Sequence, residues 1–256
     1  MEATATKSPD LTGFSREAVE TISRSRNEPD WVLEARLKAW DTYESIPMPK
    51  RTDEEWRRTD LRRLKLDRFA PYADVDGEVA ELGALTTSVD AMQFGEADQR
   101  AGILASRDSS RPYVELDPSL AEKGVIFTDL NTAVREHPEL VQKYFMTQAV
   151  PVDFGKFEAL HAAMWQVGAF LYVPKGVQVE LPFRSFAFGQ TPGSSVFTHS
   201  LVVVEEGAEA FFVDAFHSET QDEASFASAV VELILADDAK LRYVQVQDWG
   251  RNVWNF

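Results

Sequence analysis

The chain has 256 residues, of which 44% are hydrophobic and 11% aromatic, and it has a formal net charge of −16 at pH 7. This composition is typical of a globular protein with a substantial core, in one large domain or two modest ones. The sequence has no cysteine, no apolar run long enough to span a membrane and no apolar stretch of a secretory signal near its start. It therefore excludes disulfides, thiolate catalysis and cysteine-bound metal centres within this chain, and it predicts a cytoplasmic protein.

The acidic charge is unevenly distributed. Acidic and basic residues balance within residues 1–70, so the whole excess lies in residues 71–256. Such a field repels phosphate backbones and anionic lipids, so we expect neither nucleic acid nor a membrane as a partner. The basic segment 54–69, "EEWRRTDLRRLKLDRF", contains interleaved acids and is expected to be a solvated helix face.

The N-terminal third is predicted to be helical. Residues 15–46 have helical patterning interrupted at Pro29, with Ser15 and Asp30 as candidate N-caps. A proline-marked linker leads from there into the basic segment. Residues 71–110 have no clear pattern.

The rest of the chain is predicted to pass from mixed structure to strands. The segments 111–118 and 124–130 have strand patterning, and 131–149 has helical patterning with Asn131 as a candidate cap and Pro138 opening a second segment. From about residue 157 the pattern is β-rich. We therefore expect an α+β, mainly β protein with a helical region (1–70), a mixed connecting region (71–156) and a β core (157–256).

The β core contains an internal repeat of 31 residues. Its three copies are "LYVPKGVQVELPF" from Leu171, "VVVEEGAEAFFVD" from Val202 and "LILADDAKLRYVQ" from Leu233. In each copy three apolar residues lead into a polar corner, after which apolar and polar residues alternate. The alternation aligns Val177, Val179 and Leu181 with Ala208, Ala210 and Phe212, and with Ala239, Leu241 and Tyr243.

Equal spacing stacks each copy on the next, because one copy cannot bury its apolar face alone. The repeat therefore predicts a β-solenoid, most simply a parallel β-helix. A fourth corner would fall beyond Phe256, so we expect the β-helix to be incomplete at the C-terminus and the chain to be the N-terminal portion of a longer protein.

Few residues qualify as chemical sites, and no catalytic residue is assigned. His199, Asp214 and His217 are candidates for a metal site, although His199 and His217 are not one repeat apart and would not stack. The corner acids Glu205-Glu206 and Asp237-Asp238 stack and raise the possibility of general acid–base chemistry, but corner residues usually point into solvent. No phosphate loop or nucleophile elbow is recognisable.

Five longer motifs carry a family resemblance. They are "SRNEPDWVLEARLKAW", "EKGVIFTDLNTAVREHPELVQKYF", "FLYVPKGVQVELPF", "LVVVEEGAEA" and "VVELILADDAKLRYVQVQDWGRNVWNF". Together they resemble the SufB/SufD family of the SUF iron–sulfur cluster assembly system, from about residue 14 onward with gaps around 71–110. The resemblance implies a right-handed parallel β-helix, and a scaffold complex with SufB-like and SufC-like ATPase subunits on which iron–sulfur clusters are built.

Within that family the chain is most similar to the SufD branch. "EEWRRTDLRRL" resembles an N-terminal W-R-x-T-D-L element typical of SufD, and the absence of cysteine fits a partner better than a cluster-holding scaffold. "NEPDW" and "PMP" are shared with SufB, so the SufB paralogue remains an alternative. The family's SufC-binding and dimer regions would lie downstream of Phe256, so the resemblance assigns no site residue or resident cofactor to this chain.

Two other classes of function remain open from the residues. Stacked corner acids would suit a carbohydrate-binding or carbohydrate-active β-helix, and the histidines would suit a cupin-like metal enzyme. On the residues alone, a non-enzymatic scaffold or interaction protein is favoured over both.

Overall fold

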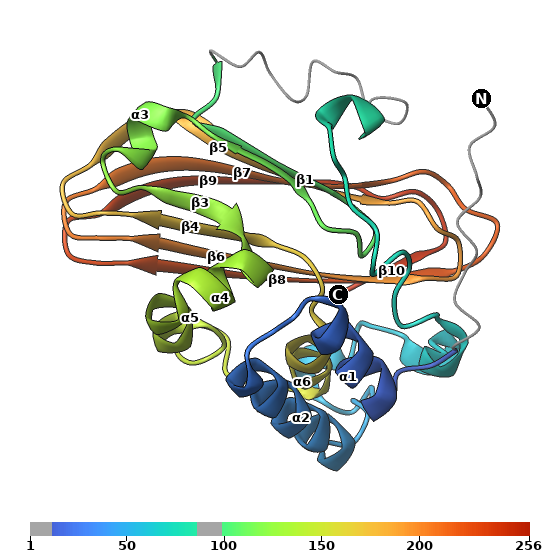
Figure 1. The fold of residues 1–256 in the computed structure, drawn as a ribbon. Coiled ribbons are helices and arrows are strands. Elements are labelled where there is room, and N and C mark those ends of the chain that lie inside the picture. The colour runs from blue at the N-terminus through green and yellow to red at the C-terminus, as the bar shows by residue number, and fades with distance from the viewer. Residues whose placement is uncertain (1–11, 86–98) are drawn as a thin grey trace.

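A computed structural model of the chain describes residues 12–85 and 99–256 (Figure 1). The α-helices are α1 (Arg16–Ser25), α2 (Asp30–Ser45), α3 (Pro118–Ala121), α4 (Leu130–Glu136), α5 (Pro138–Tyr144) and α6 (Lys156–Met164). Short 3₁₀ turns are η1 (Glu54–Trp56), η2 (Leu61–Arg63), η3 (Leu66–Arg68) and η4 (Leu82–Leu85). The strands are β1 (Gly102–Arg107), β2 (Tyr113–Leu116), β3 (Ile126–Asp129), β4 (Ala169–Val173), β5 (Gln178–Gly189), β6 (Ser195–Val204), β7 (Glu209–Ser218), β8 (Ser225–Leu235), β9 (Lys240–Asp248) and β10 (Val253–Asn255).

The predicted N-terminal helices are confirmed, with one change at a cap. The Ser15 hydroxyl accepts a hydrogen bond from the Ala18 amide, as an N-cap does. Helix α2 begins at Asp30 itself, and its N-cap position is Pro29, which makes no side-chain cap. A proline cannot continue α1 but fits the start of a helix, so Pro29 separates the two helices.

Three expectations for local structure are wrong. The basic segment 54–69 forms the turns η1, η2 and η3 and no continuous helix. Helix α4 is capped by Asp129, which accepts from the Thr132 amide, whereas Asn131 lies inside the helix. Residues 156–164 form α6, so the strands of the β core begin only at Ala169.

The strands form two mixed, mostly parallel sheets. Their strand orders are β2-β1-β5-β7-β9 and β10-β8-β6-β4-β3. From β4 onward the chain crosses to the other sheet at every strand, and strands of successive passes pair in parallel. Among the strand pairs within residues 12–85 and 99–256, only β1–β2 and β3–β4 are antiparallel. The α+β class is thus confirmed, and the parallel stacking is consistent with the predicted coils.

The register of the strands reproduces the repeat of 31 residues. Leu171 pairs with Val202, and Val202 pairs with Leu233. The third corner positions, Gly176, Gly207 and Asp238, all have left-handed backbones with φ of 73°, 64° and 57°. The Gly176 amide donates to the Glu206 carbonyl at 3.0 Å, and the Gly207 amide donates to the Asp237 carbonyl at 3.0 Å. The corners therefore stack through main-chain hydrogen bonds.

One position of the predicted alignment is wrong. A bulge in β5 shifts the register between Gln178 and Pro182, so that Phe183, and not Leu181, pairs with Phe212. Leu181 is 41% exposed, whereas Phe183 is fully buried between the sheets. Proline has no backbone N–H to donate to the hydrogen bonds between strands, and it is tolerated at a bulge. This explains why the irregularity falls at Pro182.

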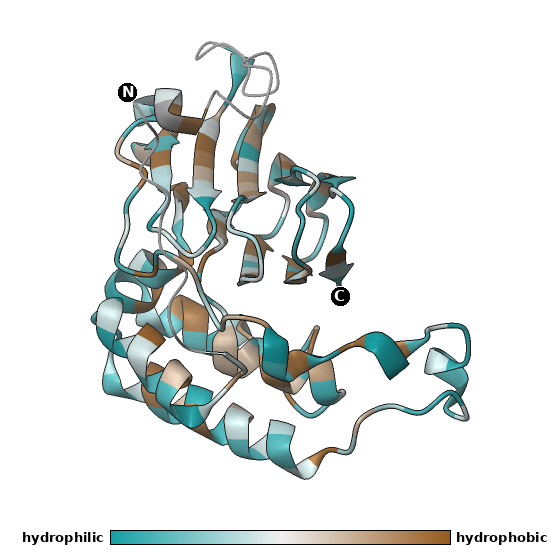
Figure 2. Cartoon of the chain, turned by 90° about the vertical axis from the view of Figure 1, so that its right-hand side faces the viewer, coloured by the Kyte–Doolittle hydropathy of each residue, from teal (hydrophilic) through white to brown (hydrophobic). Residues whose placement is uncertain are grey.

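The core lies in two layers. Interior residues such as Leu171, Phe183 and Phe212 pack between the two sheets. Helices α1, α2, α4, α5 and α6 cover the outer face of the sheet that contains β6 (Figure 1), and Phe197 and Leu201 pack against them. Figure 2 shows hydrophobic and hydrophilic residues interspersed along the strands. Within residues 12–85 and 99–256, no helix is long and apolar enough to cross a membrane.

Candidate functional site

His199 lies in the interface between the helical layer and the β6 sheet. Every residue of β6 is buried, because one face of the strand meets the other sheet and the opposite face meets the helices. The His199 amide donates to the Val167 carbonyl at 2.9 Å. Gly168 has φ of 155°, and a Cβ there would lie 1.8 Å from the His199 carbonyl oxygen, so only glycine allows this close approach.

The His199 side chain belongs to a line of four hydrogen-bonded side chains. Ser228 Oγ lies 3.0 Å from His161 Nδ1, and His161 Nε2 lies 3.2 Å from His199 Nδ1. His199 Nε2 in turn lies 3.1 Å from Glu232 Oε2. Both imidazoles and the carboxylate are completely buried. The line joins α6 to β6 and β8 across the interface.

Burial holds both histidines neutral. It lowers the pKa of His161 well below 6.5, helped by His199 and Arg36, and it lowers the pKa of His199 against the opposing effect of Glu232. With neutral rings one donor order satisfies every atom: Ser228 donates to His161, His161 to His199 and His199 to Glu232. The carboxylate also accepts the amides of Met146 at 2.7 Å and Val150 at 3.3 Å. The network therefore ties the loop after α5 to β8.

This geometry favours a hydrogen-bonded network over metal binding. All four ring nitrogens of His161 and His199 already face a hydrogen-bonding partner, so none is directed at a common centre. Among residues 12–85 and 99–256, no three His, Asp or Glu side chains are grouped so that they could hold a metal ion. The arrangement positions the helical layer on the sheet.

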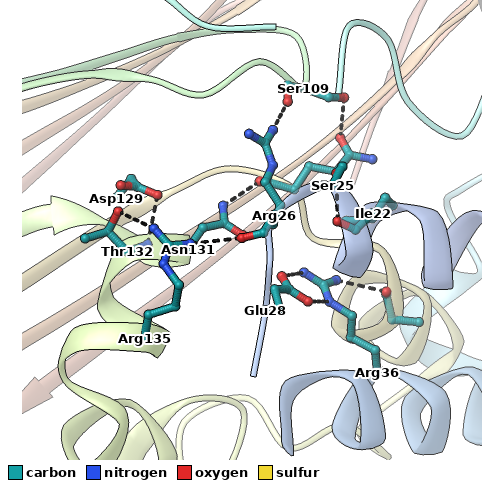
Figure 3. Close-up of polar contacts among 12 residues, drawn as sticks. Ile22, Ser25, Arg26, Glu28, Arg36, Ser109, Asp129, Asn131, Thr132 and Arg135 are labelled. Carbon is teal, nitrogen blue, oxygen red and sulfur yellow. Dashed lines mark hydrogen bonds and ion pairs between the residues drawn. The ribbon is translucent and has the colours of Figure 1, made fainter. Parts of the chain in front are cut away.

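A groove of about 540 Å³ lies next to this network, between α2 and the segment around α5. The Phe145 ring forms part of its wall and packs on His199, with 4.4 Å between the ring centres. Arg36 lines the groove, and its guanidinium binds Glu28 through two hydrogen bonds of 2.6 and 2.8 Å (Figure 3). The same guanidinium stacks on Trp165, with its Cζ atom 4.0 Å from the ring centre. The groove is thus mostly apolar, and its charged lining residues are Arg36, which is paired with Glu28, together with Lys38 and Asp153.

The other two predicted candidates lie elsewhere. Asp214 points between the two sheets, where its Oδ2 accepts from Ser200 Oγ at 2.7 Å. Burial raises the pKa of Asp214 to about 6, against the opposing effect of the Ser200 and Ser185 hydroxyls. His217 lies on the outer face of the β7 sheet, and its Nδ1 lies 3.0 Å from Asp248 Oδ2, one repeat away. The structure therefore places His199, Asp214 and His217 on three different faces and does not bring them together.

The corner acids are on the surface. Glu206, Asp237 and Asp238 are exposed, and Glu206 forms an ion pair of 2.8 Å with Lys175, one repeat earlier. Exposed carboxylates at separate corners lack the enclosed pair that glycosidic chemistry needs.

Sequence reasoning missed His161 and Glu232. Glu232 offered a signal, because an acid in the apolar run "VVELIL" is unusual at a buried strand position. His161 offered none, since its contact with His199 depends on how α6 docks on the sheet. Gln166 was missed for the same reason, although it is fully buried and accepts from Ser109 while donating to the Pro71 carbonyl.

These observations define a class of protein: stacked passes of parallel strands under a helical layer, held by buried polar networks. Comparison with known families identifies the family within this class. Residues 10–184 match the family model described as the SufBD protein N-terminal region, and residues 187–256 match the SufBD core domain of the SUF iron–sulfur cluster assembly system. The chain belongs to the SufBD family.

Curated relatives agree with this assignment. The chain is 34% identical over 251 residues to an iron–sulfur cluster assembly SufBD family protein of Staphylococcus aureus strain USA300, covering 95% of this chain and 52% of the relative. It is 34% identical over 252 residues to a protein of the same description from Staphylococcus haemolyticus, with the same coverage. The chain therefore spans about half the length of these relatives.

Proposed function

We propose that the protein is a SufD-like subunit of a cytoplasmic scaffold complex that assembles iron–sulfur clusters, with SufB-like and SufC-like ATPase partners. In this proposal the cluster is cargo of the complex, and the subunit acts by structure and interaction without catalysing a reaction itself. The observation that carries the proposal is the match to both SufBD family regions along residues 10–256, in order. The names of the relatives, which refer to cluster assembly, support it.

The SufD-like assignment rests on the segment around Trp56. This residue opens the "WRRTDL" element and packs on Phe157 of α6, with 5.2 Å between the ring centres. The element therefore belongs to the folded helical layer. The lack of cysteine supports the same choice. A SufB-like role is the second candidate, favoured by "NEPDW", whose Glu28 forms the buried pair with Arg36.

The proposed architecture is a right-handed parallel β-helix carried by a helical region. The alternation of passes between two sheets and the left-handed corner residues support it. In this proposal residues 1–70 form the helical region, 71–156 connect it, and 157–256 begin the β-helix with α6 as its entry helix.

A deletion strain tests the proposed function. We expect the activities of iron–sulfur enzymes to fall in cells that lack the gene, and to recover when the whole gene is supplied again. A metabolic enzyme that contains no iron–sulfur cluster is the control, and its activity should be the same in both strains. Normal maturation of iron–sulfur enzymes in the deletion strain would contradict the proposal.

A further inference from the structure

A polar cavity of about 340 Å³ lies where the end of α1 meets the start of α4, away from the histidine network. Three guanidinium groups line it, and they come from three parts of the chain (Figure 3 shows two of them). Its other charged or amide-bearing lining residues include Glu78, Asp129 and Asn131. In a chain with a net charge of −16, three converging arginines are unexpected.

Two of the arginines are positioned by main-chain carbonyls at the end of α1. Arg111 Nη2 donates to the Ser25 carbonyl at 3.0 Å, and Arg135 Nη1 donates to the Arg26 carbonyl at 3.0 Å. These contacts neutralise the partly negative end of the helix. Both side chains belong to exposed residues, so each guanidinium also reaches the cavity from its rim.

Arg26 lies at the base of the cavity and is only 2% exposed. Its Nη2 donates to the Ser109 carbonyl (Figure 3), while its Nε and Nη1 reach no acceptor of the described chain. Burial and the charge of Arg111 lower the pKa of Arg26 to about 10. A buried guanidinium with unmatched N–H groups is unfavourable, so an acceptor from outside the chain would stabilise it.

The nearby carboxylates do not fill this role. Asp129 is engaged in capping α4 through the Thr132 amide, and Glu28 is held in its bidentate pair with Arg36. Glu78 lies on the exposed rim of the cavity. The cavity is therefore lined by three guanidinium groups and two carboxylates, and the Nε and Nη1 donors of Arg26 have no acceptor within the described chain.

We propose that this cavity is a binding site for an oxyanion of the phosphate type, held by Arg26, Arg111 and Arg135. Guanidinium groups bind phosphate oxygens through paired, charge-assisted hydrogen bonds. The Oδ1 atom of Asn131 is buried and reaches no donor of the described chain, while its Nδ2 donates to the Gln166 carbonyl at 2.9 Å. Because Asn131 Oδ1 can accept a hydrogen bond beside the arginines, the cavity favours an oxyanion that carries a hydroxyl donor. Hydrogen phosphate has such a hydroxyl, and sulfate at neutral pH lacks one.

Isothermal titration calorimetry of the purified protein with inorganic phosphate tests the site. We expect saturable binding, weaker binding of sulfate, and at least about tenfold weaker phosphate binding when Arg111→Gln and Arg135→Gln are combined. Arg24→Gln is the matched control, because Arg24 is an exposed arginine of α1 that does not line the cavity. A parallel titration with glycerol phosphate separates two sources of the oxyanion: a monoester dianion has no P–OH to donate to Asn131 Oδ1, so it should bind more weakly than inorganic phosphate if free phosphate is the ligand. Tighter binding of glycerol phosphate would instead assign the site to the phosphate group of a larger ligand.

A gain of affinity guards against a variant that simply unfolds. Glu78→Gln removes a negative charge from the rim and should tighten phosphate binding a few-fold, whereas Glu81→Gln, outside the cavity, should not change it. Absence of saturable phosphate binding would overturn the proposal. So would unchanged affinity in both the double arginine variant and Glu78→Gln, which would leave Arg111 and Arg135 a purely structural role at the end of α1.

Discussion

Replacing Asp214 with asparagine should make the protein more stable at neutral and alkaline pH. The side chain is 1% exposed between the sheets, and burial raises its pKa from 3.8 to about 6. Between these two values the folded state binds more protons than the unfolded state, so stability falls as the pH rises through this window. One pKa unit corresponds to about 1.4 kcal/mol, so the ionised carboxylate costs the folded protein about 3 kcal/mol above pH 6.

Asparagine keeps an oxygen that can accept from Ser200 while removing the buried charge. We expect Asp214→Asn to raise the free energy of unfolding by about 2–3 kcal/mol at pH 8, and by less than about 1 kcal/mol at pH 4. His161 and His199 also affect stability, since their lowered pKa values cost the folded protein stability as the pH falls below 6.5. Both proteins contain them, so this effect cancels in the difference.

Urea unfolding followed by tryptophan fluorescence at pH 4, 6 and 8 measures the effect. Asp237→Asn, at an exposed corner, is the matched control and should leave stability unchanged within about 0.5 kcal/mol. A difference between Asp214→Asn and the wild type that does not vary with pH would refute the reasoning. So would an asparagine variant that is less stable at pH 8.

Further substitutions probe the corners and the buried network by the same urea assay. Gly207→Ala should lower the free energy of unfolding by about 1–2 kcal/mol, because Gly207 has a left-handed backbone, whereas the added Cβ itself would meet no atom within 4 Å. Asp238 has the same backbone conformation at the equivalent corner, so Asp238→Gly should make the protein more stable. The two changes in the free energy of unfolding need not be equal in size. A lower stability of Asp238→Gly would contradict the inference that the corners at 207 and 238 are equivalent. Glu232→Ala should lower stability by about 3–5 kcal/mol, because it leaves two amides and an imidazole unsatisfied, whereas the exposed Glu206→Ala should change little. A double-mutant cycle between Lys175 and Glu206 should give no more than about 1 kcal/mol, and less at high salt, since both side chains are more than half exposed. A larger coupling energy would show that the corner pair is more than a surface contact.

The repeat could be predicted from the sequence because each pass repeats the same physical problem. Apolar residues must face the interior and the chain must turn at the same place, so Leu171, Val202 and Leu233 align in the sequence and pair in the sheet. The corner types follow as well, since a left-handed backbone favours glycine or aspartate. The bulge at Pro182 was not predictable from alternation, because a shift of two residues preserves the period of two.

The helical layer was predicted less well because tertiary packing decides its details. Arg36 occupies a core position of α2, and only the docking of Glu28 and Trp165 explains why a charge is buried there. The segment 54–69 has helical spacing, yet its turns are fixed by contacts such as Trp56 on Phe157. The partners of His199 come from α6 and β8, and no sequence spacing links them. Asp214 and His217 were recognised as chemically distinctive, but spacing could not place them on separate faces.

Native mass spectrometry of the protein purified from its own cells through an affinity tag tests the central claim most directly. We expect a complex that contains a SufB-type subunit and a SufC-type ATPase together with the tagged protein. A tagged protein that appears only alone, or only with copies of itself, under conditions in which SufB-type and SufC-type proteins are present in the cells, would contradict it.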